Sequence, residues 1–121
     1  MYQFNLGEIF WLEIAYEDEP NESKIRPVII VGNKDNNLLI LVSTTTKSPD
    51  YPPKYYDKFK IPILNWHKAG FIEPSWALGF RLIELSVEEL KSLVTPEDYI
   101  GIMHKSDFNF LTYQLELIHK K

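Results

Sequence analysis

Cysteine is absent from the 121 residues of this chain. Without thiols the chain forms no disulfide, no thiolate zinc site and no cysteine nucleophile. No apolar run approaches the roughly 20 residues that span a bilayer. The first residues, MYQFN, also lack the basic and apolar regions of a signal peptide. We therefore expect a cytoplasmic protein that makes no membrane contact.

An excess of positive charge is also lacking, because the formal net charge is −4 at pH 7. This balance argues against a protein that coats nucleic acid with its whole surface. The charge is uneven, however: residues 46–60 contain four lysines against two aspartates, whereas residues 17–22 are mainly acidic. A local site for a polyanion is therefore compatible with the acidic total.

The apolar pattern predicts a β-rich α+β fold, with residues 1–121 as a single domain. Phe10, Leu12 and Ile14 alternate along a first strand. The continuous apolar runs PVIIV and LLILV, separated by the turn-forming GNKDNN, predict an antiparallel hairpin of buried strands. Further strands are expected at residues 58–64 and 75–85, and Pro62 favours an edge position for the first of these.

Helices are expected in the last third of the chain. Ser86 and Glu89 have the spacing of a capping box and predict a short helix that ends near Val94. Thr95 followed by proline fits a second helix start. A C-terminal helix is expected from about Ser106. Its apolar stripe should lie on the sheet and consists of Phe108, Leu111, Leu115 and Ile118.

The hairpin raises a question because its strands begin with an arginine and end with three threonines. If the turn is centred on Asp35, Leu39 faces Val31 and Arg26 faces Thr44 across the ladder. A slipped register would bring another hydroxyl residue opposite the arginine, either Ser43 or Thr45. Alternatively, the strand end is solvated and Arg26 pairs with an acidic residue of the preceding loop.

Four segments, GEIFWLEI, RPVIIV, LVSTTT and AGFIEPSW, resemble in the same order the PemK/MazF-like toxins of bacterial type II toxin–antitoxin systems. The similarity extends from Gly7 to about Gly101. It implies an SH3-like small barrel with a C-terminal helix and short connecting helices, usually in a homodimer. It also implies an mRNA interferase that cleaves single-stranded RNA without a metal or cofactor and is inhibited by a small antitoxin protein.

The resemblance implies catalytic roles for Arg26, which precedes the proline, and for Thr44, the first residue of the threonine pair. In such a reaction the 2′-hydroxyl of RNA attacks the adjacent phosphate through a dianionic transition state. A guanidinium can bind two of its oxygens and a hydroxyl can donate to a third. Many family members carry a basic residue where this chain has Ile83. Arg81, two positions away in the predicted strand, should lie on the same face and substitute for it.

Residues 46–56 form a predicted substrate-binding loop, because tyrosines among lysines suit base stacking and phosphate attraction. Alternatively, the tyrosines pack on the domain and the lysines are solvated. The residues expected to contact substrate are Thr45, Lys47, Tyr51, Lys54, His67 and Arg81.

His67 has a second interpretation as a loop histidine that packs beside Trp66. Trp11 and Trp76 are expected in the core or in a dimer interface, rather than against nucleobases. Two other functions stay open at this stage. One is a non-catalytic module on the same fold that binds nucleic acid or protein, and the other is a histidine-dependent enzyme centred on His67.

Overall fold

The computed structural model describes residues 3–15, 23–35 and 37–120, so the acidic run at residues 17–22 lies outside the described residues. Within these ranges, no helix is long and apolar enough to cross a membrane. The elements in chain order are β1 (Glu8–Ala15), β2 (Ser23–Lys34), β3 (Leu38–Thr45), the 3₁₀ helix η1 (Tyr55–Phe59), β4 (Lys60–Ile63), β5 (Ser75–Leu78), β6 (Ile83–Ser86), α1 (Val87–Leu93), the 3₁₀ helix η2 (Pro96–Asp98), β7 (Tyr99–Ile102) and α2 (Lys105–Ile118).

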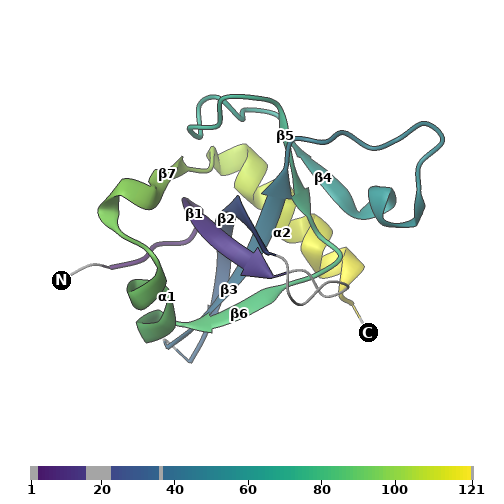
Figure 1. Ribbon diagram of the computed structural model, residues 1–121. Helices are drawn as coiled ribbons and strands as arrows, with labels where there is room; N and C mark the ends of the chain where they lie inside the picture. The colour runs from purple at the N-terminus through teal and green to yellow at the C-terminus, as the bar shows by residue number, and fades with distance from the viewer. Residues whose placement is uncertain (1–2, 16–22, 36, 121) are drawn as a thin grey trace.

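Seven strands of the described residues form one antiparallel sheet in the order β4-β5-β3-β2-β1-β7, and β6 also pairs with β3 (Figure 1). β3 joins the parts of the sheet, because its first half pairs with β6 and its last two residues pair with β5. The sheet and its helices confirm the β-rich α+β fold. Among the described residues no pairing joins β4 to β7, so the expected barrel is open along that seam.

Apolar side chains cover both faces of the central strands, as the continuous apolar runs predicted. On one face Ile29 and Val42 pack in a core with Leu111 of α2. On the other face Val28 packs in a second core with Leu90 of α1. The predicted stripe of α2 is confirmed, because all of its members belong to or pack against the first core, namely Phe108, Leu111, Leu115 and Ile118.

β2 and β3 form the predicted hairpin, but in a different register. Val28 faces Ser43, which is one residue further along β3 than predicted. The turn is centred one residue later than expected, and a β-bulge after Ile30 adds one unpaired residue to β2. The predicted pairing of Arg26 with Thr44 across the ladder is therefore wrong.

The single strand predicted at residues 75–85 is two strands, β5 and β6, because the chain turns at Gly79. The N–H of Gly79 donates to the carbonyl oxygen of Phe59 at 3.0 Å. A Cβ at this glycine would lie 3.0 Å from the carbonyl oxygen of Phe59, a tight contact with backbone that favours a residue without a side chain. The turn lets β5 and β6 pair with different halves of β3. Pro62 lies in β4, at an edge of the sheet as predicted.

The helix signals are confirmed in part. Ser86 Oγ accepts from the N–H of Glu89 at 3.0 Å, and the Glu89 carboxylate accepts from the N–H of Ser86 at 2.8 Å. This capping box begins α1 as predicted. Thr95 begins only the single turn η2, after which the chain enters β7, a strand that the sequence did not predict.

Candidate active site

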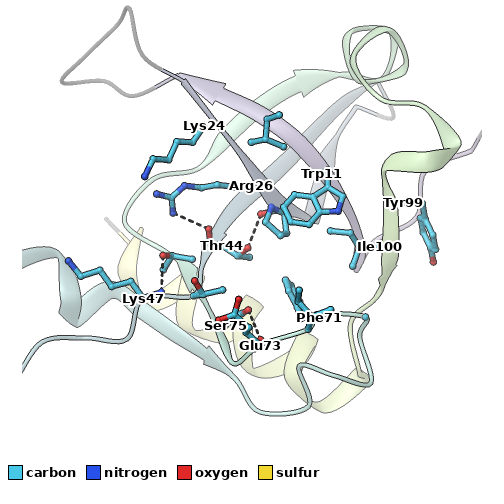
Figure 2. A pocket seen from close by; sticks show the side chains of 16 residues that line it. Trp11, Lys24, Arg26, Thr44, Lys47, Phe71, Glu73, Ser75, Tyr99 and Ile100 are labelled. Atoms are coloured by element: carbon cyan, nitrogen blue, oxygen red, sulfur yellow. Dashed lines mark hydrogen bonds between the residues drawn. The ribbon is translucent and has the colours of Figure 1, made fainter.

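A pocket of about 690 Å³ opens at the end of the β2–β3 hairpin that lies away from its turn (Figure 2). Residues 24–27 of β2 and residues 44–47 at the end of β3 form one part of its wall. The other part comes from Trp11 of β1, from the loop between β4 and β5, and from Tyr99 and Ile100 of β7. The pocket therefore combines segments that are distant in the sequence.

Arg26 lies half-buried at this pocket, and its Nη1 donates a hydrogen bond to the backbone carbonyl oxygen of Thr44 at 3.2 Å. The two residues predicted to be catalytic are thus neighbours. Their contact differs from the expected one, because the guanidinium meets the backbone of Thr44 and not its hydroxyl. The hydrogen bond fixes the direction of the guanidinium at the pocket wall.

The hydroxyl of Thr44 has another partner. Its Oγ1 donates to the carbonyl oxygen of Pro27 at 2.9 Å, and only 1% of the residue is exposed. The hydroxyl therefore links the end of β3 to β2 beside the pocket. The next threonine has a local role as well, since Thr45 Oγ1 accepts from the N–H of Lys47 at 3.1 Å.

Three cationic residues, Lys24, Arg26 and Lys47, lie on one side of the pocket in Figure 2. Lys47 is held through its backbone, because Lys60 Nζ donates to the Lys47 carbonyl oxygen at 3.1 Å. Lys60 in turn forms an ion pair with Asp57 at 3.0 Å, and both side chains are almost fully buried. The ion pair thus holds the Lys60 ammonium where it can bind the backbone at the start of the loop.

Asp57 also organises the rest of this loop. Its Oδ2 accepts from the N–H of Lys54 at 2.8 Å and from the N–H of Asp50 at 3.0 Å. These two backbone hydrogen bonds, together with the Lys60 ammonium, lower the pKa of Asp57 from 3.8 to about 2. One carboxylate therefore connects three points of the predicted substrate-binding loop.

The opposite side of the pocket is apolar, and the sequence did not predict it. It is formed by Trp11, Phe71, Ile72, Tyr99 and Ile100. Trp11 is 43% exposed, so it lies outside the core, and a dimer interface stays the other expected position for it. The available signal was the strand alternation, which directs Trp11 away from the face of its buried neighbours in β1.

Two glycines bring the loop between β4 and β5 against β7. A Cβ at Gly101 would lie 2.0 Å from the carbonyl oxygen of Ala69. A Cβ at Gly70 would lie 2.5 Å from the carbonyl oxygen of Ile100, and Gly70 has a φ of +106°. This backbone-to-backbone contact places Phe71 beside the pocket, and it requires residues without side chains.

The other predicted substrate-binding residues lie outside the pocket lining. Tyr51 is fully exposed, and Lys54 forms an exposed ion pair with Asp50 at 3.4 Å. His67 lies in the loop between β4 and β5, with its ring 5.4 Å from that of Trp66. Arg81 lies in the turn between β5 and β6. The strand argument for Arg81 is therefore wrong, because the alternation of a strand does not extend through that turn.

No three His, Cys, Asp or Glu side chains of the described ranges are grouped in a way that would hold a metal ion.

Comparison with known proteins gives one family and several related folds. The family model for the PemK-like, MazF-like toxin of type II toxin–antitoxin systems matches residues 5–118. No curated protein matches the chain.

Among solved structures, the chain is similar to the Mycobacterium tuberculosis toxin MazF-mt6, with 16% identity, 92% of this chain and 94% of that chain covered, and a TM-score of 0.59. It is also similar to a crystal structure of MazE–MazF from Deinococcus radiodurans, with 14% identity, full coverage of both chains and a TM-score of 0.64. A further crystal form of that complex has 13% identity, 97% and 96% coverage, and a TM-score of 0.61. At these identities the structures demonstrate a shared fold.

Proposed function

Because the chain belongs to the PemK-like, MazF-like toxin family, we propose that it is an endoribonuclease that cleaves single-stranded RNA. The observation that carries this proposal is the guanidinium of Arg26, fixed by the Thr44 carbonyl oxygen at a pocket that also contains Lys24 and Lys47. A fixed, planar cation within a group of positive charges suits a phosphodiester that gains charge during reaction.

The proposed reaction is an internal displacement at phosphorus. The 2′-oxygen of RNA forms a bond to the adjacent phosphate while the bond to the 5′-oxygen breaks. The 2′-hydroxyl loses a proton and the leaving oxygen gains one, which yields a 2′,3′-cyclic phosphate and a 5′-hydroxyl. The pentacoordinate transition state is dianionic. Arg26 stabilises it by donating two parallel hydrogen bonds, and Lys24 and Lys47 add positive charge nearby.

Thr44 completes the proposed catalytic pair. Thr44 lines the pocket, and its hydroxyl donates to the Pro27 carbonyl oxygen in the free protein. Donation to the phosphate would require the hydroxyl proton to turn away from Pro27 when substrate binds. Thr44 also acts as a positioning residue, because its carbonyl oxygen orients Arg26.

Substrate binding extends from the pocket in this proposal. Thr45 and Lys47 contact the RNA at the pocket itself. RNA that continues beyond the pocket contacts side chains of the loop and of the neighbouring turns, namely Tyr51, Lys54, His67 and Arg81. Their exposure allows contact with a flexible strand.

The partners that we propose for this chain are those that its family suggests. The related Deinococcus radiodurans structures are MazE–MazF complexes, so we propose that a small antitoxin protein binds this chain and covers its pocket. We propose a homodimer as the active form and the cytoplasm as the compartment.

The proposal is tested with purified protein and a long single-stranded RNA, with and without EDTA. Wild-type protein should cleave in EDTA. Arg26→Ala should lower kcat by about 10²–10³-fold, the loss seen when one oxyanion donor is removed. Lys34→Ala is the matched control, because Lys34 lies at the turn end of the same hairpin in an exposed ion pair with Glu84. It should cleave like wild type.

The other results decide between the remaining functions. Cleavage that survives Arg26→Ala would exclude the proposed mechanism. Loss of cleavage in His67→Ala alone would favour a histidine-dependent enzyme. If wild-type protein binds RNA and leaves it intact, the chain is a binding module on this fold.

A further inference from the structure

The pocket has two halves of different chemistry, and the proposed reaction uses only one of them. Figure 2 shows Lys24, Arg26 and Lys47 on one side, and Trp11, Phe71 and Tyr99 on the other. A phosphate accounts for the cationic half alone. During RNA binding the apolar half suits a part of the RNA that is joined to the phosphate but is itself flat and weakly polar.

Trp11 is the main feature of the apolar half. Its neighbours Phe10 and Leu12 are buried, whereas Trp11 is 43% exposed within the pocket lining. Ile72, on the loop between β4 and β5, belongs to the same lining and is 88% exposed. Large apolar side chains that stay exposed in a concave site are typical of ligand binding.

The position of Trp11 relative to Arg26 follows from the strand pairing. Trp11 lies directly opposite Pro27, the residue after Arg26, in the β1–β2 ladder. Opposed residues of such a ladder have Cβ atoms about 5 Å apart. Arg26 is the neighbour of Pro27 and begins on the other face of β2, but its side chain and that of Trp11 both reach the lining of the pocket. One RNA strand can therefore contact Arg26 with a phosphate and Trp11 with a base in the same pocket. The pocket volume of about 690 Å³ also lies within the usual range for small-molecule sites.

Glu73 adds a constraint on the base. It lines the same pocket, and within the described ranges its carboxylate takes part in no hydrogen bond or ion pair, while its backbone oxygen accepts from Ser75 Oγ at 3.0 Å. A carboxylate repels phosphate, so Glu73 does not contribute to the binding of phosphate. It accepts well from amino groups such as N4 of cytosine or N6 of adenine. Uracil instead has carbonyl oxygens on both sides of its only N–H, and these repel a carboxylate.

We propose that the apolar half is a nucleobase subsite in which a base stacks on Trp11 and presents an exocyclic amino group to Glu73. The inference rests on single-stranded RNA as the ligand of the proposed function. The subsite selects adenine or cytosine over uracil at the nucleotide whose phosphate contacts Arg26.

The test uses 2′-O-methyl hexanucleotides of adenine, cytosine or uracil, which cannot be cleaved because the nucleophile is blocked. Their dissociation constants are measured by fluorescence anisotropy. Wild-type protein should bind the adenine and cytosine hexamers at least fivefold more tightly than the uracil hexamer. Trp11→Leu should weaken binding to all three by about tenfold, the usual loss for one stacking platform. Trp11→Phe should retain most of the affinity.

Glu73→Gln should remove the preference and leave uracil binding unchanged or tighter, because glutamine can donate to the uracil carbonyl oxygens. Two exposed residues of α2 outside the pocket provide matched controls, Tyr113→Leu for the loss of an aromatic ring and Glu116→Gln for the loss of a carboxylate. Neither should change binding.

Equal binding of the three hexamers by wild-type protein would overturn the proposal, as would a preference that persists in Glu73→Gln. Unchanged affinity in folded Trp11→Leu, checked by circular dichroism, would also overturn it and would point to an occupant other than a base. The endoribonuclease proposal and the subsite proposal can each be overturned without the other. Base-dependent binding without cleavage of ordinary RNA would overturn the endoribonuclease alone, and cleavage without this dependence would overturn the subsite alone.

Discussion

At the scale of single residues, the contact between β7 and the loop before β5 depends on the absence of side chains. Gly101→Ala would place a Cβ 2.0 Å from the Ala69 carbonyl oxygen, and β7 cannot retreat from that oxygen without disturbing its pairing with β1. We expect the free energy of unfolding to fall by about 1–3 kcal/mol or more, as measured by urea denaturation.

Gly32→Ala is the matched control for this substitution. Its Cβ would lie 3.7 Å from Ile40, an ordinary contact with a side chain. The loss of stability should therefore be clearly smaller than for Gly101→Ala. Equal losses in the two variants would show that the close backbone approach is not what limits position 101.

The types of residue in the sequence predicted which side chains lie at this site. They did not predict which atoms of those residues contact one another. Arg26 and Thr44 are neighbours as expected, yet the later turn centre shifts the register, which the bulge in β2 offsets only in part, and the guanidinium contacts the Thr44 backbone instead of its hydroxyl. Several Asn and Asp residues in the turn tolerate similar conformations, so the sequence does not fix the turn centre. Trp11 was not predicted at the pocket, because strand alternation shows that its side chain leaves the face of Phe10 and Leu12 but does not show that it lines a pocket.

At the scale of elements, the loop from β3 to β4 is held by one carboxylate. The pKa of Asp57 is lowered from 3.8 to about 2 in the folded protein by its backbone hydrogen bonds and by Lys60. Its stabilising contribution is therefore complete above pH 3.8 and is lost as pH falls toward 2. Asp57→Asn removes the charge at every pH. The melting temperatures of wild type and variant should differ most above pH 4 and converge toward pH 2.

Asp35→Asn, in the exposed turn of the hairpin, controls for the loss of a single carboxylate. A wild-type advantage over Asp57→Asn that stays constant from pH 5 to pH 2 would contradict the proposed role of the ionised Asp57.

Long, strongly patterned elements were predictable and short ones were not. The hairpin and α2 each carry an apolar pattern over many residues, and both form as predicted. β7 contains four residues, of which Gly101 is a poor strand former, so its pairing with β1 depends on tertiary contacts. The division of residues 75–85 into β5 and β6 likewise depends on tertiary pairing, because the two strands pair with different halves of β3, which local sequence does not express.

At the scale of the whole molecule, the net charge of −4 contrasts with the three cations of the pocket. RNA held mainly by Lys24, Arg26 and Lys47 should release few counterions. The logarithm of the binding constant for an uncleavable hexanucleotide should therefore fall with the logarithm of salt concentration with a slope of about −2 for three contacts to a single strand. Anisotropy titrations between 50 and 200 mM salt give this slope.

A slope steeper than about −4 would contradict this prediction. It would show that phosphates contact more cations than Lys24, Arg26 and Lys47 of the pocket together with Lys54 and Arg81 beyond it, and the other lysines of the loop after β3 would then be the first place to seek them.

The pocket wall contains residues from Trp11 to Ile100, and this wide separation matters while the chain is being synthesised. Proteins emerge from the ribosome N-terminus first, at about 5–20 residues per second. β2 and β3 can therefore pair and bring Arg26 to Thr44 while β7 is still untranslated. Trp11 gains the other wall of its pocket only when Tyr99 and Ile100 emerge. With the proposed function, a nascent chain would thus lack a complete site for the messenger RNA that encodes it until β7 has left the ribosome.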